Sequence, residues 1–497
     1  MPSTAKPDPT ADRSFFGHPR GLATLFMTEM FERFSYYGMR AILILYMVAK
    51  VEAGGLGFGD QKAGSVYGMY AAMVYLMCLA GGWVGDRIAG QRRAVLIGGI
   101  LIAAGEFSLV IPGEAFFYLG LVLLMAGTGM LKGNVSAIVG QLYPQGDPRR
   151  DSGYSIFYMG INLGALLSPL ACGWVGEHIS WRLGFGVAGL GMLFGLVQFM
   201  LTSHHLGNAG LEPASTGDAA RDRRQRASAL RGLLIGVGAV VVIGTLAALG
   251  FINLNPTAIS DGIGWLLLAI SAVVFAWLIF FGNWTPVERK RSAAVLVLFV
   301  ASALFWATFE QAGSSLNLFA DRFTNCNLFG FEFPSSWYQS VQPVFVIAFA
   351  PVFAWLWLKL ASKEPPAPAK FMFGLLFGGL AFLLLVPAAR MTLGGGKAGP
   401  WWLIGTYFLQ TLGELCLSPV GLSAMSKLAP ARAAGFMMGI WFLSTSIGNW
   451  LAGRAVTVSA SMSLPSLFGS VGWFSIGAAV VLGLLIKPTV RLMQGVK

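Results

Sequence analysis

Long stretches of apolar residues, separated by short polar segments, recur along the whole chain. An α-helix needs about 20 predominantly apolar residues to cross a bilayer, and these stretches have that length. They predict spans at residues 21–49, 62–85, 94–111, 115–142, 153–176, 181–202, 232–252, 263–283, 292–320, 336–359, 371–390, 400–427, 432–456 and 466–486. The pattern therefore predicts an all-α membrane protein with fourteen transmembrane helices.

The composition agrees with this interpretation. Hydrophobic residues make up 56% of the chain and charged residues 11%, whereas a soluble protein carries about 25% charged residues. The lipid bilayer is therefore the expected surrounding of most of the chain. The net charge of +12 would also suit a nucleic-acid-binding protein. We expect no nucleic-acid partner, because the basic residues occur in short loops between spans and not on one face.

The distribution of basic residues also predicts the topology. Lys and Arg are enriched in cytoplasmic loops, and here they gather in alternate loops, for example at 87–93, 149–150, 221–231 and 289–291. We therefore expect a multi-pass protein of the inner (plasma) membrane with both termini in the cytoplasm. Residues 1–20 are polar and lack the short apolar core of a cleaved signal peptide, so the first span is expected to remain.

The spans fall into groups of six, two and six. The predicted parts are a cytoplasmic N-terminal tail, a first six-helix bundle, a basic cytoplasmic linker, an inserted helix pair, a basic cytoplasmic loop, a second six-helix bundle and a cytoplasmic tail, at residues 1–20, 21–203, 204–231, 232–283, 284–291, 292–487 and 488–497. The inserted pair contains no charge within its spans, so we expect it to be peripheral and dispensable for the mechanism.

Two six-helix halves joined by a basic linker resemble transporters of the major facilitator superfamily. The segment GGWVGDRIAGQRR at residues 81–93 resembles the loop signature of that superfamily. A generic basic loop would explain its Arg residues but not the Gly-Asp-Arg-x-x-Gly spacing. The resemblance implies a major facilitator fold, with the substrate site between the two bundles near the middle of the membrane.

The first span carries three charged residues on one helical face, Glu29, Glu32 and Arg33. Each charge inside a membrane costs a few kcal/mol, so it requires a partner or a function. A purely structural cluster is the alternative to a transport site. Two carboxylates against one guanidinium leave an excess negative charge, and this favours a site that takes a further cation.

Other spans supply further charges. Lys132 lies in the fourth span of the first bundle, and Glu310 and Glu414 lie in two spans of the second. Opposite charges on two bundles can form ion pairs that a proton or a zwitterionic ligand would break. Glu106 lies near the end of its span without an evident partner, and we interpret it as structural.

Any side chain that takes up a proton within the spans is expected to be a carboxylate. Histidine is the side chain that titrates most readily near neutral pH, but the four histidines fall in predicted loops or tails, at positions 18, 178, 204 and 205. The four cysteines are scattered and show neither a disulfide framework nor metal-ligand spacing. We therefore expect no metal and no cofactor, with protons as the coupling ion.

Several motifs together resemble the proton-dependent oligopeptide transporter (POT/PTR) family, as found in bacteria. The first is E-x-x-E-R in the first span, and the others are LKGNVS, FYMGINLGALLSP, FWATFEQAGSS and GELCLSPVGLS, which begin at residues 131, 157, 305 and 413. They occur in the family's order, and the resemblance covers residues 17–487. It implies a proton-coupled symporter that imports di- and tripeptides by alternating access.

The resemblance also implies roles for individual residues. Arg33 and Lys132 would hold the peptide carboxylate, and Asn162 and Glu414 its α-amino group. Glu310 would be a principal proton site that exchanges an ion pair with Arg33, and Glu29 and Glu32 would complete the proton-linked network. Aromatic residues would line the side-chain pockets, namely Tyr36, Tyr37, Tyr75, Trp306 and Trp441. Gln342 stands where the family usually has Asn before Pro, and would contribute to the amino-end site.

Two other function classes remain to be weighed. The same fold could carry nitrate or another small organic anion, although the complete E-x-x-E-R set favours peptides. A membrane enzyme would need a catalytic His, a metal-binding carboxylate cluster or a nucleophile near the membrane surface, and the sequence offers none. We therefore expect a transporter and not an enzyme, functional as a monomer.

Overall fold

The computed structural model describes residues 12–144, 146–213, 218–253, 255–328, 330–429, 434–459 and 461–496. These residues are almost entirely helical, which confirms the all-α prediction, and each predicted span contains a helix. The helices are α1 (Arg20–Val48), α2 (Asp60–Val84), α3 (Gln91–Val110), α4 (Glu114–Gln141), α5 (Arg149–His178), α6 (Trp181–Thr202), α7 (Ala219–Ala248), α8 (Pro256–Ala276), α9 (Pro286–Phe309), α10 (Ser315–Phe323), α11 (Val341–Leu360), α12 (Ala367–Thr392), α13 (Pro400–Leu428), α14 (Ala434–Ser459) and α15 (Leu464–Leu492).

Shorter elements connect some of these helices. Single turns follow α2 and α9 as η2 (Gly85–Ala89) and η5 (Glu310–Gly313), and η6 (Ser335–Ser340) precedes α11. The antiparallel strands β1 (Asn327–Leu328) and β2 (Phe331–Glu332) form a small hairpin. Among the described residues, eleven helical segments are long and apolar enough to cross a membrane. The chain is therefore a multi-pass membrane protein.

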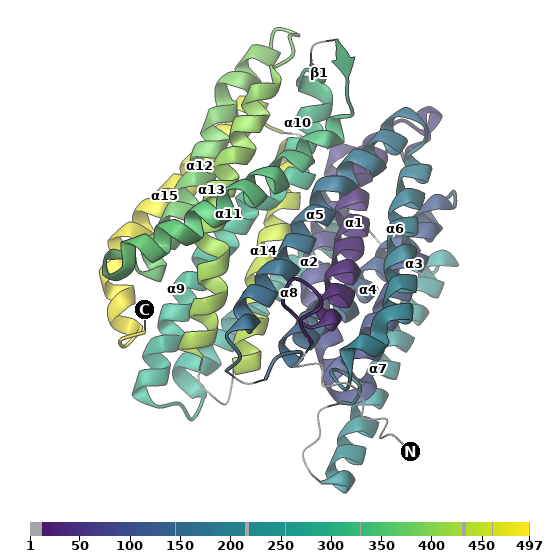
Figure 1. Ribbon diagram of the computed structural model, residues 1–497. Helices are drawn as coiled ribbons and strands as arrows, with labels where there is room; N and C mark the ends of the chain where they lie inside the picture. The colour runs from purple at the N-terminus through teal and green to yellow at the C-terminus, as the bar shows by residue number, and fades with distance from the viewer. Residues whose placement is uncertain are drawn as a thin grey trace. The chain divides into compact units, whose positions relative to one another are not determined.

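The chain divides into two compact units. Unit 1 contains Met1–Met39 and Leu76–Asn255, and unit 2 contains Arg40–Tyr75 and Pro256–Lys497. Helices α1 and α2, drawn in purple to blue in Figure 1, each contribute residues to both units. As a result, the E-x-x-E-R motif belongs to unit 1, whereas Arg40, at the next position after Met39 on the same helix, belongs to unit 2.

In unit 1, α3 packs along α4 and α6, and α5 packs against α6. Glycines permit the closest approach between α3 and α4. A Cβ atom on Gly127 would lie 2.7 Å from the carbonyl oxygen of Gly98, too close for any side chain. Such close backbone approach by small residues is a common way to pack membrane helices.

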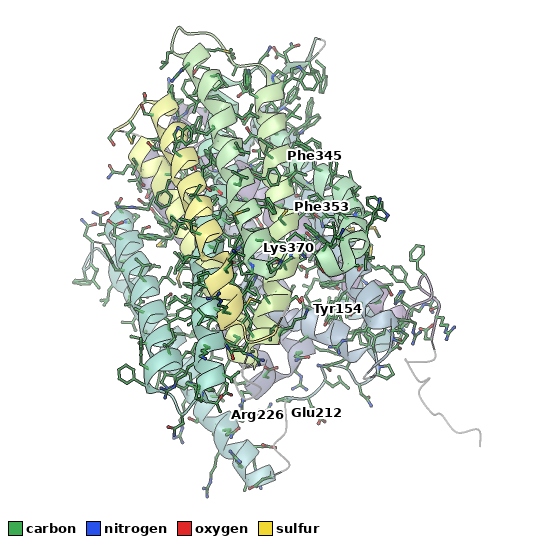
Figure 2. The ribbon with its side chains drawn as sticks, turned by 90° about the vertical axis from the view of Figure 1, so that its left-hand side faces the viewer. Tyr154, Glu212, Arg226, Phe345, Phe353 and Lys370 are labelled. Carbon is green, nitrogen blue, oxygen red and sulfur yellow. The ribbon has the colours of Figure 1, made fainter. Side chains whose placement is uncertain are left out.

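In unit 2, α12 packs against α15 and α13, and α9 packs against α14. Phe345 and Phe353 lie along α11 (Figure 2). The Phe345 ring meets that of Phe408 on α13, with centroids 5.3 Å apart. At the start of α12, the buried Lys370 ammonium lies 4.2 Å from the ring centroid of Trp357 and pairs with Glu364. These contacts connect α11 to its neighbours.

The predicted span at 292–320 is not one continuous helix. Helix α9 ends at Phe309, η5 covers the next turn, and α10 begins at Ser315. Ser314 has φ −127° and ψ −99°, outside the helical region, so the regular hydrogen-bond ladder stops there. The break begins at Glu310, one of the predicted proton sites.

Helix α7 begins within the segment that we predicted as a polar linker. The Asp218 side chain accepts hydrogen bonds from the backbone N–H groups of Ala220 and Arg221 and so caps the helix. The residues that follow are rich in Arg and Ala, which are good helix formers. Capping and propensity therefore extend α7 into residues 219–231, ahead of its apolar part.

Helix α8 is attached to α14 in unit 2. Asp261 pairs with Arg454, and the Trp450 ring covers Gly264 so closely that a Cβ atom there would overlap it. Asp261 is part of the helix because α8 begins at Pro256, earlier than the sequence pattern indicated. Other apolar side chains of α8 are exposed, among them Trp265 and Val273, so the peripheral position and the dispensability of the inserted pair both stay predictions.

Candidate functional site

The charged motif of α1 is held in place from behind by small residues of α5 and α6. A Cβ atom on Gly164 of α5 would overlap the Met30 carbonyl oxygen and lie 3.0 Å from the Arg33 Cβ. On α6, a Cβ atom on Gly191 would overlap the Phe34 ring. The two glycines let α1 approach α5 and α6 closely. This packing sets the backbone position of the charged residues of α1.

Arg33 is the centre of a buried ionic cluster in unit 1. Its Nε and Nη2 atoms donate to the two carboxylate oxygens of Glu32, and Nε lies 3.4 Å from Oε1 of Glu29. The guanidinium carbon lies 4.9 Å from the ring centroid of Tyr36 and 5.9 Å from that of Tyr37. All three predicted charges thus meet, and two aromatic rings cover the guanidinium.

Lys132 of α4 supplies a second positive charge to this cluster. It is half-buried and lies within electrostatic range of Glu29, Glu32 and Arg33. The cluster then contains two carboxylates and two cations, so it is formally neutral. Asn162 is also buried in unit 1, but its Nδ2 atom donates to the Tyr158 carbonyl oxygen of its own helix at 3.0 Å.

In unit 2, Glu310 forms an ion pair with Arg40. The Arg40 Nη2 atom lies 2.7 Å from Glu310 Oε2, and Arg40 Nε donates to the Tyr67 hydroxyl at 2.7 Å. The sequence motifs assign no role to Arg40 or Tyr67. A signal was present: Arg40 lies seven residues after Arg33, about two helical turns, and therefore on the same face of α1. The predicted exchange of Glu310 with Arg33 stays a prediction.

Glu414 has a different partner from Glu310. The Gln342 Nε2 atom of α11 donates to Oε2 of Glu414 on α13 at 3.1 Å. Glu414 is half-buried and lies within electrostatic range of Glu310. A half-buried carboxylate near a second carboxylate favours a cationic ligand. Gln342, which stands where the resemblance leads us to expect Asn, thus contacts Glu414 through its side-chain amide.

The predicted pocket aromatics of unit 2 occupy different environments. Trp306 lies 5.5 Å from the ring of Phe305 and 5.2 Å from that of Phe309, and it is 9% exposed. Trp441 packs on Gly421 and is also buried. Tyr75 of α2 is half-buried. The two tryptophans therefore contribute to helix packing.

Comparisons with known proteins agree with this arrangement. The family model described as "POT family" matches residues 92–228 and 235–474. The peptide transporter YePEPT of Yersinia enterocolitica is 40% identical, over 97% of this chain and 96% of its own. A di-/tripeptide transporter of Lactococcus lactis subsp. cremoris is 35% identical, over 98% of this chain and 99% of its own.

A solved structure shows the same fold. The crystal structure of the peptide transporter POT in complex with sulfate has 42% sequence identity, covers 98% of both chains and gives a TM-score of 0.90. The predicted major facilitator type of membrane fold is thereby confirmed. The family model covers most of the chain, and both relatives match over nearly their whole length. This chain therefore belongs to the POT family, whose members are membrane transporters and not enzymes.

Proposed function

We propose that this chain is a proton-coupled symporter that imports di- and tripeptides across the bacterial inner membrane, with both termini in the cytoplasm. Relatives that share 35–40% of its sequence over almost their whole length carry the names of peptide transporters. The same chemistry suits this chain because a short peptide has one carboxylate and one ammonium group, whatever its side chains. The working unit in this proposal is the monomer.

The observation that carries the proposal is that the two compact units offer a ligand different kinds of charged group, cations in unit 1 and a carboxylate in unit 2. In unit 1, Arg33 and the half-buried Lys132 offer a guanidinium and an ammonium to a carboxylate. In unit 2, the half-buried Glu414 offers a carboxylate held by a neutral amide. A zwitterionic peptide carries a group of opposite charge for each kind, whereas a small anion carries one for the first kind alone.

Other predicted residues complete the site in this proposal. Asn162 would contribute an amide to the peptide amino end once its side chain leaves the Tyr158 carbonyl. Gln342 would orient Glu414. The rings of Tyr36, Tyr37, Tyr75, Trp306 and Trp441 would limit the space for peptide side chains.

Proton coupling would act on buried ion pairs. A proton bound to Glu310 removes the charge that holds Arg40, so protonation releases α1 from η5 at this point. Glu29 and Glu32 compete for the same Arg33 guanidinium that the peptide carboxylate requires. Protonation of these carboxylates therefore breaks their ion pairs with arginine and favours binding of the peptide carboxylate to Arg33. Return of the pairs after proton loss favours peptide release.

Uptake of labelled dialanine into liposomes that contain the purified protein tests the proposal. With an inside-alkaline pH gradient and a negative-inside potential, we expect accumulation that a protonophore abolishes. Lys132→Ala should reduce dialanine uptake by at least about tenfold. Removing one partner of a buried charged contact costs about 2–5 kcal/mol of binding free energy. No uptake of any of several di- and tripeptides by folded protein would refute peptide transport and direct the search to small anions.

A further inference from the structure

Glu106 of α3 is a buried carboxyl group outside the cluster described above. It is fully inaccessible, and its Oε1 atom accepts a hydrogen bond from the Ser35 hydroxyl of α1 at 3.0 Å. Its Oε2 atom has no hydrogen-bond partner among the residues that the structure describes. A carboxyl group in such a place is costly, and it contacts the helix that carries the E-x-x-E-R motif.

Ser35 lies on the back of α1 relative to Arg33. Two residues along an α-helix correspond to a rotation of about 200°, so the Ser35 hydroxyl and the Arg33 guanidinium leave α1 in nearly opposite directions. Ser35 is itself fully buried. The hydrogen bond to Glu106 therefore restrains the rotation of α1 at the level of the ionic cluster but from the opposite side.

The surroundings of Glu106 leave it little freedom. A Cβ atom on Gly189 of α6 would lie 3.1 Å from the Glu106 Cβ, so α6 closes over this side chain. One turn further along α1, a Cβ atom on Gly38 would overlap the Cys172 sulfur of α5. Helix α1 thus has close packing contacts behind it, and Ser35–Glu106 is a directional polar contact among them.

We propose that Glu106 is a positioning residue for substrate binding: through Ser35 it sets the rotation of α1 and hence the direction of the Arg33 guanidinium. This inference rests on the proposed peptide transport. It assigns Glu106 an effect on affinity for the peptide carboxylate, without contact with the peptide.

Four variants test the proposal in the dialanine uptake assay. Ser35→Ala removes the donor and Glu106→Leu removes the acceptor, and we expect either to raise the KM for dialanine about fivefold with kcat changed less than about twofold. Glu106→Gln retains an oxygen acceptor at the same chain length and should keep KM within about twofold of the wild type. The double variant Ser35→Ala/Glu106→Leu should be no worse than Glu106→Leu alone, because both remove one bond.

Ser108→Ala is the matched control. Ser108 is also buried on α3, and its hydroxyl donates to the Phe116 carbonyl oxygen of α4 at 2.8 Å, away from α1. Its loss should lower the thermal midpoint as much as Ser35→Ala does, yet leave KM unchanged. An unchanged KM in Ser35→Ala, or an equal rise in Ser108→Ala, would overturn the proposal. Failure of Glu106→Gln to preserve KM would do so as well.

A second measurement needs no substrate. Hydrogen–deuterium exchange of the α1 amides should rise in Ser35→Ala and Glu106→Leu but not in Ser108→Ala. If the wild type transports none of several di- and tripeptides, the proposed function fails, while hydrogen–deuterium exchange still tests the contact. Unchanged α1 exchange in both variants would refute the positioning role even if transport is normal.

Discussion

The Nη2 atom of Arg40 lies 2.7 Å from Oε2 of Glu310, and both side chains are almost completely buried. Removing one partner of a buried ion pair is strongly destabilising, because the remaining charge is then buried without a counter-ion. The Tyr67 hydroxyl accepts a further hydrogen bond from Arg40 and so keeps this guanidinium partly satisfied when Glu310 takes up a proton.

Glu310→Gln tests the role of this pair in proton coupling. The substitution keeps the side-chain volume but cannot ionise, so it imitates the protonated state permanently. We expect proton-driven accumulation of dialanine to fall by at least about tenfold, while exchange of labelled for unlabelled dialanine across the membrane persists. Both are measured in the same liposomes.

Asp60→Asn is the matched control for that variant. Asp60 accepts two hydrogen bonds from Arg322, at 2.7 and 2.8 Å, but this pair is about one-third exposed. Exposed pairs contribute little, so accumulation should change less than about twofold. Normal accumulation in Glu310→Gln, or equal losses in both variants, would contradict the proposed coupling role.

Gln342→Asn tests how the peptide amino end is held. The shorter amide no longer reaches Glu414 from the same backbone position, so Glu414 loses the donor at 3.1 Å. We expect the KM for dialanine to rise about threefold to fivefold, with a smaller change in kcat. Competition by N-acetyl-dialanine, which lacks the ammonium group, should be unaffected. Equal weakening for both compounds would show that Gln342 acts on the fold and not on the amino end.

His18 predicts a pH dependence of stability. It is buried just before α1, and its Nδ1 atom shares a hydrogen bond of 2.9 Å with the Tyr143 hydroxyl. Burial lowers the pKa of His18 below its ordinary value of 6.5, and Arg149 lowers this pKa further, while Asp147 opposes the shift. Unfolding therefore takes up a proton as the pH falls below about 6.5, and stability is lost in that direction.

The thermal midpoint of the wild type should fall between pH 7.5 and pH 5.5 by more than that of His18→Gln. Glutamine cannot titrate in this range, so it removes the contribution of this position. His178→Gln is the control. His178 is the last residue of α5 and stacks on Trp174, with ring centroids 4.3 Å apart. Equal pH-dependent losses in the wild type and His18→Gln would exclude the effect.

Gly264→Ala tests the attachment of α8 to α14. The added Cβ would overlap the Trp450 ring, so the helices must separate or the ring must move. Overpacking of this kind costs about 1–3 kcal/mol, and we expect a lower thermal midpoint. Adding Trp450→Ala should recover part of the loss. Gly262→Ala, where no atom lies within 4 Å, should be neutral; a loss as large as that of Gly264→Ala would point to helix propensity or backbone effects instead.

The sequence was sufficient to predict the membrane spans and the ionic cluster on α1. Spans follow from length and apolarity, which are local properties. The joint position of Glu29, Glu32 and Arg33 follows from helical periodicity alone. These predictions needed no knowledge of how separate helices pack.

The partners that connect distant helices could not be predicted in this way. Arg40 is followed by no nearby acid, and its partner lies 270 positions further along the chain. Glu106 is similar, because its partner Ser35 belongs to another helix, and serines are too frequent to single one out. The break at η5 depends on the conformation of Ser314, which the apolar pattern around Glu310 does not indicate.

Helix α1 carries Arg33 in one compact unit and Arg40 in the other, and no break interrupts it between them. The Cα atoms of the two arginines lie about 10 Å apart along one continuous helix. A proton that frees Arg40 can therefore influence Arg33 by twist or axial shift of the helix, with no loop to absorb the motion. One residue inserted after Phe34 would turn Arg40 by about 100° relative to Arg33. Every charge would remain, but Arg33 and Arg40 would no longer point in the same direction from α1. Peptide binding at Arg33 and proton uptake at Glu310 would then no longer be coupled.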